Sequence, residues 1–492
     1  MDVENLQAAD AEIKEEAASS EPPSPYSVWW EEPHDQDPEN PENWSTKRKW
    51  SIIAVLSIMT LLTPLASSML APGVPRMMAD FGSDNNQEKT FVVSIFVLGF
   101  AVGPLIMAPL SELYGRMPVF HVGNTMFVFF SVACAVATDA GMMLAFRFFA
   151  GFFGVAVLTC GSGCIADMMP PEQRGRAMSI WSMGPLLGPV IGPVCAGFLV
   201  EDLDWRWIFW VVTIVSGVVV LASFFIIRET YAPAILEKKA AKLRSSTGDD
   251  KYHSRLQKPG TPRQLFLAAI VRPTRLFFFS PIVAIMCTYV AVTYGLLYLL
   301  FTTFTFVYTE VYGFSAVGAG LSFLGGGIGN FFGLAFIGYF SDRVIQKAKA
   351  EGKAPQPEQR LNLILTVPTA LLLPLGLIMY GWTAEKHLHW IVPMIGTGIM
   401  GFGMIGIFMV IQTYLVDAFT AHAASVTAAN TVLRSVLGAL LPLCGLQLYD
   451  ALGLGWGNTL LGLIALALAP VPWLLHRYGE RIRNHPKFQR EF

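Results

Sequence analysis

Twelve windows of about 20 apolar residues dominate this chain, and each is long enough for a helix that crosses the hydrocarbon core of a bilayer. The first six lie near residues 50–72, 91–112, 119–138, 142–165, 177–200 and 207–227. The second six lie near residues 279–304, 314–340, 361–382, 388–415, 422–446 and 456–476. With 53% hydrophobic and only 14% charged residues, the chain has too few charges to cover a soluble globule of 492 residues. The pattern predicts an all-α integral membrane protein of two six-helix bundles, residues 47–228 and 277–477.

The Lys and Arg residues are distributed unequally between the loops. If both termini are cytoplasmic, the inner segments hold 28 of the 34 basic residues, whereas the outer loops hold only Arg76, Lys89, Arg206 and Lys386. Cytoplasmic loops of membrane proteins carry an excess of Lys and Arg. The sequence therefore predicts a multi-pass protein with both termini in the cytoplasm.

Three polar segments remain outside the bundles. Residues 1–46 are acidic and rich in proline, which predicts a disordered cytosolic tail. Residues 229–276 form a basic cytoplasmic loop with a helix-prone run at Ile235–Leu243, placed along the inner leaflet or against the bundle, and residues 478–492 form a cytosolic C-terminal tail. All six cysteines fall in predicted spans, so we expect apolar packing residues and neither disulfides nor metal ligands.

The fifth span contains a regular stripe of glycine and proline, in the stretch Trp181–Leu199. Gly184, Gly188 and Gly192 are spaced by four, which places them on one helix face, and each is followed by a proline. Such a helix allows close approach of a neighbour and suits two halves that rock against each other. The alternative is a close-packing helix in any membrane bundle.

The two halves also echo each other at their cytoplasmic turns. The turn after the second span contains Glu112, Gly115 and Arg116, and the matching turn after the eighth span contains Asp342 and Arg343. An acid and a base at the membrane surface can form an ion pair that stabilises one conformation and breaks in another. We therefore expect these residues to contribute to gating.

From Asn40 to about Tyr478, the chain resembles the major facilitator superfamily, and more narrowly its fungal twelve-span drug:proton antiporters. The stretches that carry the resemblance are Ala108–Phe120, Leu144–Gly154, Cys164–Gly175, Gly188–Gly197, Tyr414–Phe419 and Ala428–Ser435. The first departs from the general pattern at Ala108, where a glycine is usual, and at Met117, where a second base is common.

This resemblance implies roles for several residues. Glu112, Gly115 and Arg116 match the loop that gates the inner side, and Arg147 matches the fourth-span arginine implicated in proton coupling. The fifth-span antiporter motif covers Gly184, Gly188, Pro189, Gly192, Pro193 and Gly197. The resemblance thus implies the twelve-helix fold of the superfamily and export in exchange for protons.

Two arginines lie within predicted spans, and no Asp or Glu lies in the middle of any span. Arg434 is about 12 residues into its span, near the bilayer centre, and Arg147 is shallower. An unpaired buried cation is unfavourable, so these arginines either bind carbonyls and hydroxyls or await an anionic substrate. Asp167, Glu112 and Asp417, all at cytoplasmic helix ends, are the imperfect candidates for the proton carrier, with His121 as a further alternative.

A substrate cavity is expected between facing spans that combine aromatic and amide groups. The candidates are Tyr289, Tyr294, Tyr298, Asn330, Gln412 and Asn430. Gly325–Gly329 lies in an apolar span without a following Lys-Ser/Thr pair, so it predicts helix contact and not a phosphate loop.

With these features, the resemblance implies a secondary active transporter in the plasma membrane that exports a drug, toxin or secondary metabolite by proton antiport. The expected partners are a small-molecule substrate, protons and the lipid bilayer, without nucleic acid, metal or cofactor, and the protein is expected to be monomeric. The alternative is an organic-acid exporter that uses Arg147 and Arg434, and a lesser one is a non-transporting sensor on the same fold. An enzyme is least expected, because no nucleophile, metal or paired-carboxylate constellation is evident.

Overall fold

The computed structural model describes residues 26–33, 37–256, 261–350, 357–419 and 423–483. The helices of the first half are α2 (Thr46–Ser68), η3 (Ala71–Gly73), α3 (Val74–Asp80), α4 (Asn86–Tyr114), α5 (Arg116–Ala135), α6 (Ala140–Gly154), α7 (Ala156–Met168), α8 (Pro171–Asp202) and α9 (Arg206–Ile226). Those of the second half are α12 (Pro281–Glu310), α13 (Ala316–Ala350), η4 (Pro357–Leu361), α14 (Leu363–Glu385), α15 (Ile391–Ala418), α16 (Ala423–Leu440), η6 (Leu441–Cys444), α17 (Gly445–Leu468) and α18 (Val471–Arg483). The cytoplasmic elements are β1 (Ser27–Val28), η2 (Pro41–Asn43), α10 (Ala232–Thr247), β2 (His253–Ser254) and α11 (Pro262–Phe279).

Eleven stretches of the described chain are long and apolar enough to cross a membrane, and the last of them contains two crossings. This stretch, Ser425–Arg483, has 59 residues. At about 1.5 Å per residue it would extend for roughly 90 Å, far beyond a hydrocarbon core of about 30 Å. Gly453 breaks it with a non-helical backbone (φ 76°, ψ 171°), and Gly455 donates its N–H to Glu385 at the end of α14. The twelve predicted spans are therefore present.

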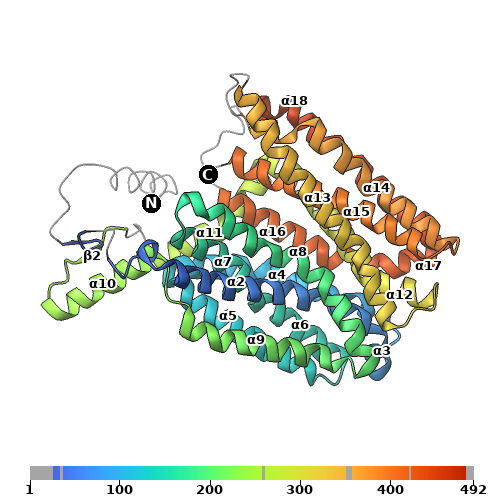
Figure 1. The fold of residues 1–492 in the computed structure, drawn as a ribbon, viewed down its shortest axis with the longest axis horizontal. Coiled ribbons are helices and arrows are strands. Elements are labelled where there is room, and N and C mark those ends of the chain that lie inside the picture. Colours follow the sequence, from blue (N-terminus) through green and yellow to red (C-terminus); the bar gives the residue numbers. More distant parts are fainter. Residues whose placement is uncertain (1–25, 34–36, 257–260, 351–356, 420–422, 484–492) are drawn as a thin grey trace.

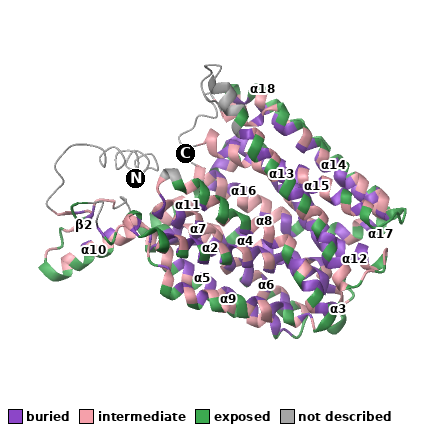
Figure 2. Ribbon diagram, in the orientation of Figure 1, coloured by how far each residue is buried: buried purple, intermediate pink, exposed green. Residues whose placement is uncertain are grey.

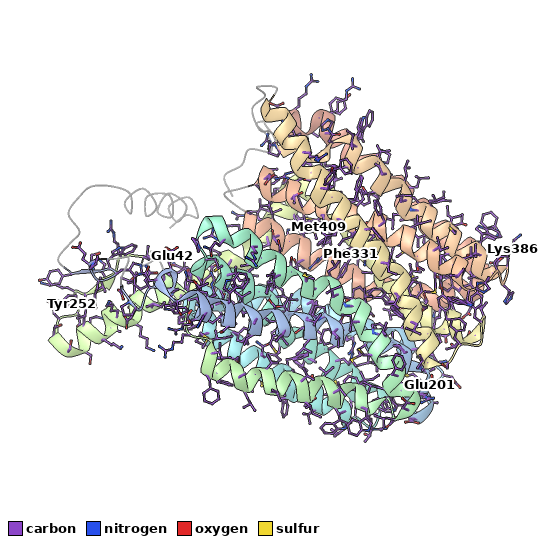
Figure 3. The ribbon with its side chains drawn as sticks, in the orientation of Figure 1. Glu42, Glu201, Tyr252, Phe331, Lys386 and Met409 are labelled. Atoms are coloured by element: carbon purple, nitrogen blue, oxygen red, sulfur yellow. The ribbon has the colours of Figure 1, made fainter. Side chains whose placement is uncertain are left out.

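The two halves lie side by side; the helices of the first half run roughly along the long axis of the molecule, and those of the second half, such as α13 and α14, run obliquely to it (Figure 1). Figure 3 places Glu42 and Tyr252 at one end of the molecule and Glu201 and Lys386 at the other. The segment before the first span and the central loop thus share one side, as the charge distribution predicts, and we call this side cytoplasmic.

The surface of the bundle is apolar where helices face outward. Figure 2 shows exposed residues along the outer helix faces and buried residues where helices pack. Phe225 is 87% exposed, Trp456 60% and Phe331 58%. An apolar surface of this extent is suited to lipid and not to water.

The N-terminal segment differs from the expectation of disorder. Ser27–Val28 pairs in parallel with His253–Ser254, and Trp30 and Trp44 are buried. Lys239 on α10 forms ion pairs with Glu31 (3.0 Å), Asp37 (3.5 Å) and Glu39 (3.7 Å). The prediction is wrong for residues 26–33 and 37–45, because a lysine of the central loop neutralises the acids and the tryptophans supply apolar contact. Residues 1–25 lie outside the described part.

The central loop and the C-terminus also have more helix than expected. The helix-prone run Ile235–Leu243 lies within α10, which confirms it as helical. The helix α18 continues to Arg483, so the second bundle extends beyond residue 477, and residues 484–492 lie outside the described part.

Candidate functional site

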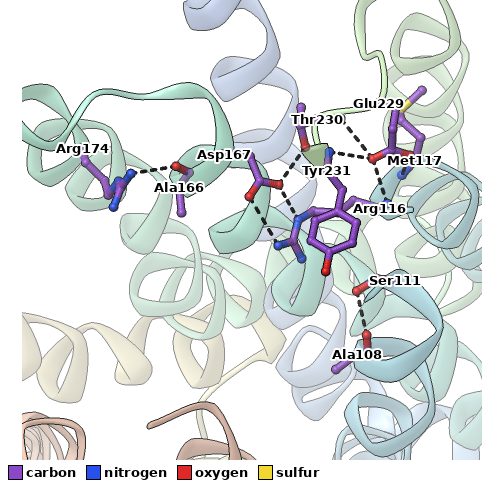
Figure 4. Close-up of polar contacts among 10 residues, drawn as sticks. All are labelled: Ala108, Ser111, Arg116, Met117, Ala166, Asp167, Arg174, Glu229, Thr230 and Tyr231. Atoms are coloured by element: carbon purple, nitrogen blue, oxygen red, sulfur yellow. Dashed lines mark hydrogen bonds and ion pairs between the residues drawn. The ribbon is translucent and has the colours of Figure 1, made fainter. Parts of the chain in front are cut away.

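A compact polar cluster joins the cytoplasmic ends of α4, α5 and α7 (Figure 4). Gly115, between α4 and α5, has φ 96°, a conformation that favours glycine. The carboxylate of Glu229 accepts the backbone N–H groups of Arg116 (3.0 Å) and Met117 (3.1 Å), the first residues of α5. A carboxylate at a helix N-terminus satisfies N–H groups that lack helical partners and complements the helix dipole. A Cβ added to Gly115 would collide with this carboxylate.

Arg116 and Asp167 form one ion pair within this cluster. The Nε of Arg116 lies 2.6 Å from Oδ2 of Asp167, and both side chains are largely buried. Thr230 donates its hydroxyl to the same Oδ2 (3.2 Å), and the guanidinium lies 4.9 Å from the ring centre of Tyr231. The predicted gating base and the predicted proton-coupling acid are therefore in contact. Glu112 is exposed on the last turn of α4.

Glu229 is the residue of this cluster that the sequence analysis missed. Its carboxylate also accepts the N–H groups of Thr230 (3.0 Å) and Tyr231 (2.9 Å), so it ties the start of the central loop to α5. The available signal was an acid directly after the sixth span, on the same side as the glycine turn.

The second half has its own inner ion pair, at a different position from the one expected. Arg360 of η4 binds Asp417 at the end of α15 (2.9 Å) and donates to the hydroxyl of Ser341 (2.9 Å). Arg343 instead lies over the ring of Tyr339 (4.0 Å), and the side chain of Asp342 lies outside the described part. The structural counterpart of Arg116 is therefore Arg360, because η4 brings its side chain to the end of α15.

Arg147 is 1% exposed and binds four backbone carbonyl groups. Two belong to Ala66 and Ser67 at the end of α2 (both 2.9 Å), and two belong to Val92 (2.9 Å) and Val93 (3.2 Å) of α4. Carbonyls in the last turn of a helix have no partner within that helix, so a buried cation satisfies them well. Of the two environments predicted for a buried arginine, Arg147 has the one made of carbonyls.

The glycine stripe of α8 packs against α2 of the same half. A Cβ at Gly184, Gly188 or Gly192 would come within 2.7–2.8 Å of backbone atoms of α2, which confirms that the three share one face. At the outer end of α8, Gly197 meets the second half, where a Cβ would lie 2.7 Å from the carbonyl oxygen of Ala316. The stripe itself thus stabilises one half, and its outer end contacts the other.

The two halves are in contact at their outer ends. Glu201 accepts the backbone N–H of Val317 (3.1 Å), and Asn86 donates to Asp450 (3.2 Å). Nearer the middle, Ser94 donates to the carbonyl of Ala439 (2.8 Å). These contacts close the outer side of the interface between the halves.

A cavity of about 670 Å³ lies between the halves on the inner side of these contacts. Helices of both halves line it, including α2, α4, α7, α8, α12, α13, α15 and α16. Its lining reaches Ala108 near the end of α4 and Ala423 at the start of α16, both at the cytoplasmic side. Pro185 and Pro189 of the fifth span line it as well. The cavity therefore extends toward the cytoplasmic side and lies inward of the outer contacts between the halves.

Three of the six predicted cavity residues line this cavity, namely Tyr294, Tyr298 and Asn330. Tyr289 is fully buried in the core of the second half. Asn430 donates to Gln412 (2.8 Å), and Gln412 donates to Thr427 (3.3 Å), so this amide pair joins α15 to α16 behind the lining. Tyr289, Gln412 and Asn430 are thus packing residues in this arrangement.

Arg434 lines the cavity and differs from Arg147 in its partners. Its guanidinium lies 5.0 Å from the ring centre of Tyr294 and 5.2 Å from that of Phe408. Its Nε is buried and has no hydrogen-bond partner in the described part of the chain. The middle of the cavity therefore presents a cation held against aromatic rings.

The remaining candidates have structural surroundings. His121 lies 3.3 Å from the hydroxyl of Ser223 and stacks on Phe224 at 4.2 Å. All six cysteines are free thiols, and no cluster of His, Cys, Asp and Glu in the described residues is suited to a metal ion.

Comparisons with known proteins agree with this architecture. The family model of the Major Facilitator Superfamily matches residues 56–442. The MFS-type transporter penM of Penicillium rubens is 49% identical over 488 residues, which cover 99% of this chain and 95% of that protein. The efflux pump radE of Floropilus chiversii is 47% identical, with 94% of this chain and 86% of that protein covered.

Solved structures share the fold at low sequence identity. A bacterial homologue of the human lysosomal transporter Spinster has a TM-score of 0.67 at 16% identity, covering 90% of this chain and 100% of that chain. A D-xylose–proton symporter has a TM-score of 0.66 at 15% identity, covering 86% of this chain and 97% of that chain.

Proposed function

Because this chain belongs to the major facilitator superfamily and is a membrane transporter of small molecules, we propose that it exports an organic molecule from the cell in exchange for protons. The observation that carries this proposal is the cavity between the halves, which is lined by both of them and reaches the cytoplasmic side. A site at such an interface becomes accessible from the other side when the two halves rock around it. Export is supported further by the relative that is named an efflux pump.

The cavity supports a transported molecule of moderate size and largely apolar character. Its volume lies within the range of sites for drug-sized ligands. Apolar walls with few polar anchors bind amphipathic molecules such as drugs, toxins and secondary metabolites. The plasma membrane is the location at which removal of such a molecule protects the cell.

The contact between Arg116 and Asp167 supports the assignment of Asp167 as the proton carrier. Protonation of Asp167 would remove the charge that holds Arg116 and Thr230, and so would loosen the inner end of α7. Ser162, five residues earlier on α7, lines the cavity, so the acid lies about 7–8 Å farther along the same helix toward the cytoplasmic side. We therefore assign the coupled proton to this ion pair.

Export can be tested in cells that lack their own pumps, by measuring the accumulation of neutral, cationic and anionic compounds with and without a protonophore. We expect lower accumulation in cells with the protein at their surface, and loss of this effect when the protonophore is added. Thr159→Trp, which fills the cavity, should abolish export, whereas Phe331→Trp on the exposed face of α13 should not. Unchanged accumulation across the panel, with the protein at the surface, would contradict export.

The assignment of the proton is tested separately with Asp167→Asn, and Asp84→Asn in an exposed outer loop serves as the control. We expect Asp167→Asn to make efflux insensitive to the protonophore and to the outside pH, and Asp84→Asn to behave like the wild type. If Asp167→Asn retains the full response to the protonophore, another group carries the proton.

A further inference from the structure

We propose that the transported molecule is an organic acid with a flat aromatic body, and that Arg434 binds its acidic group. This inference rests on the proposed function, because it names the class of molecule that the cavity between the halves accepts.

Arg434 has unused hydrogen-bonding capacity. Within the described part of the chain its guanidinium has no hydrogen bond and no ion pair, and its contacts are the rings of Tyr294 (5.0 Å) and Phe408 (5.2 Å). Contact with aromatic faces fixes the guanidinium plane and leaves the N–H groups at its edge available. A planar fork of N–H donors fits the two oxygens of a carboxylate.

The lining of the cavity carries an unbalanced positive charge. Among the described residues that line it, Arg434 is the only charged side chain, and no Asp or Glu is present. A cation within a membrane-spanning bundle is unfavourable unless a counter-charge or water accompanies it. An acidic ligand supplies the counter-charge that the protein lacks.

Arg147, the other arginine within the spans, does not compete for the anion. Arg147 already donates to four backbone carbonyls and is 1% exposed. It is absent from the lining of the cavity. The cavity therefore offers a single cationic anchor, which matches a ligand with one acidic group.

The walls of the cavity indicate the chemical character of the rest of the ligand. The rest of the lining is rich in aromatic and aliphatic side chains, among them Phe100, Trp181, Leu186, Phe301 and Met404. Flat aromatic groups make favourable stacked and edge contacts with such walls. A single acid on an aromatic frame is therefore the chemistry that the cavity complements.

The inference can be tested by binding, without reference to transport. The purified full chain in lipid nanodiscs is dialysed against 9-anthracenecarboxylate and, separately, against its neutral counterpart 9-anthracenemethanol. We expect the wild type to bind the acid about tenfold or more tightly than the alcohol, the ratio expected when charge-assisted hydrogen bonds are added. Equal affinities, or no binding of the acid, would overturn the inference.

Arg434→Gln should lower the affinity for the acid to that for the alcohol and leave the affinity for the alcohol within about threefold. Arg434→Lys keeps the charge without the planar fork, so we expect an intermediate ratio. Arg481→Gln, at an exposed arginine of α18, is the matched control and should retain the wild-type ratio. A loss of affinity for both compounds in Arg434→Gln, with an unchanged melting temperature, would assign Arg434 to packing and contradict the inference.

The outcomes separate this inference from the proposed function. A preference for the acid in binding, without export in cells, would overturn export and leave the binding assignment intact. Export of neutral and acidic compounds alike, with no preference in binding, would support export and overturn the role of Arg434. If Arg434→Gln fails to fold, the ratio in the wild type and in Arg434→Lys still decides the matter.

Discussion

Each half of the molecule holds one arginine within its spans, and the two arginines have opposite surroundings. In the first half, Arg147 faces the end of α2, where helix carbonyls lack partners, and its guanidinium donates to backbone carbonyls as well as lying 4.9 Å from the ring centre of Phe96. In the second half, Arg434 lines the cavity and lies against the rings of Tyr294 and Phe408, and within the described residues it has no hydrogen bond. The comparison teaches that a charge at membrane depth is not by itself a ligand site. A buried cation is available to a ligand only where the protein does not already supply its hydrogen-bond partners.

The cytoplasmic ends of the two halves also differ in how deeply their ion pairs are buried. In the first half, Asp167 and Glu229 hold Arg116, the start of α5 and the start of the central loop together. In the second half, Arg360 binds Asp417 and Ser341, and Asp417 is more exposed than Asp167. The ion pair between Arg116 and Asp167 is therefore more buried than the one between Arg360 and Asp417.

The largest effect that we expect is a difference in the free energy of unfolding between variants of Arg147 and variants of Arg434. Arg147→Met removes the partners of two helix-end carbonyls and should lower the free energy of unfolding by about 3–4 kcal/mol. Arg434→Met should change it by less than about 1 kcal/mol, because Arg434 has no hydrogen bond to lose within the described residues. Unfolding of the purified variants in detergent, followed by circular dichroism, measures both values. Similar losses for the two variants would contradict the comparison.

A smaller difference is expected between the inner ion pairs. Arg116→Gln leaves a largely buried Asp167 without its cation and should cost about 2 kcal/mol. Arg360→Gln should cost about 1 kcal/mol or less, because the carboxylate of Asp417 is 40% exposed and water replaces the partner. The same unfolding measurement compares them, and a greater loss in Arg360→Gln would contradict the order expected from burial.

Two glycines near the cytoplasmic ends of the two halves, Gly115 in a turn and Gly338 in a helix, provide a third comparison. Gly115→Ala places a Cβ against Glu229 at a positive φ, so we expect a loss of about 1–2 kcal/mol. Gly338 lies in α13 with open space around it, so Gly338→Ala should be neutral or stabilising by up to about 1 kcal/mol. Melting temperatures of both variants suffice as the measurement. Equal destabilisation would mean that neither the positive φ of Gly115 nor its contact with Glu229 distinguishes it from Gly338.

The smallest effect concerns pH and the N-terminal segment, whose acids pair with Lys239 of the central loop. Burial favours a higher pKa for Asp37, but the N–H groups of Glu31 and Glu39 and the charge of Lys239 outweigh it and lower the pKa. The stability that this carboxylate contributes is thus fully present above its unfolded pKa of about 3.9 and is lost as the pH falls through the lowered value.

Hydrogen exchange of residues 26–33 as a function of pH measures this effect. We expect the protection of these amides, relative to their intrinsic exchange rates at each pH, to fall as the solution becomes more acidic than about pH 4, with no matching change in α18. Asp37→Asn should show fast exchange at every pH. Protection that persists unchanged in Asp37→Asn would mean that the buried tryptophans alone hold the segment.

The positions of cavity residues on α12 show where prediction from sequence ended. Tyr294 and Tyr298 are four residues apart and share a helix face, and both line the cavity. Tyr289 is five residues before Tyr294, which rotates it by roughly 140° to the core of the second half. All three fit the composition of a cavity wall equally well, so only the orientation of the helix separates them.

The twelve spans, their sidedness and the shared face of Gly184, Gly188 and Gly192 follow from the sequence alone. These are local properties, because the length of an apolar run, the count of basic residues in a loop and the helical period need no knowledge of partners. The tertiary structure decided which groups meet: Glu229 with α5, Arg360 with Asp417, the acidic N-terminal segment with Lys239, and Arg147 with the end of α2. It also left Arg434 facing the cavity, since the fate of a buried charge depends on the groups that other helices bring to it.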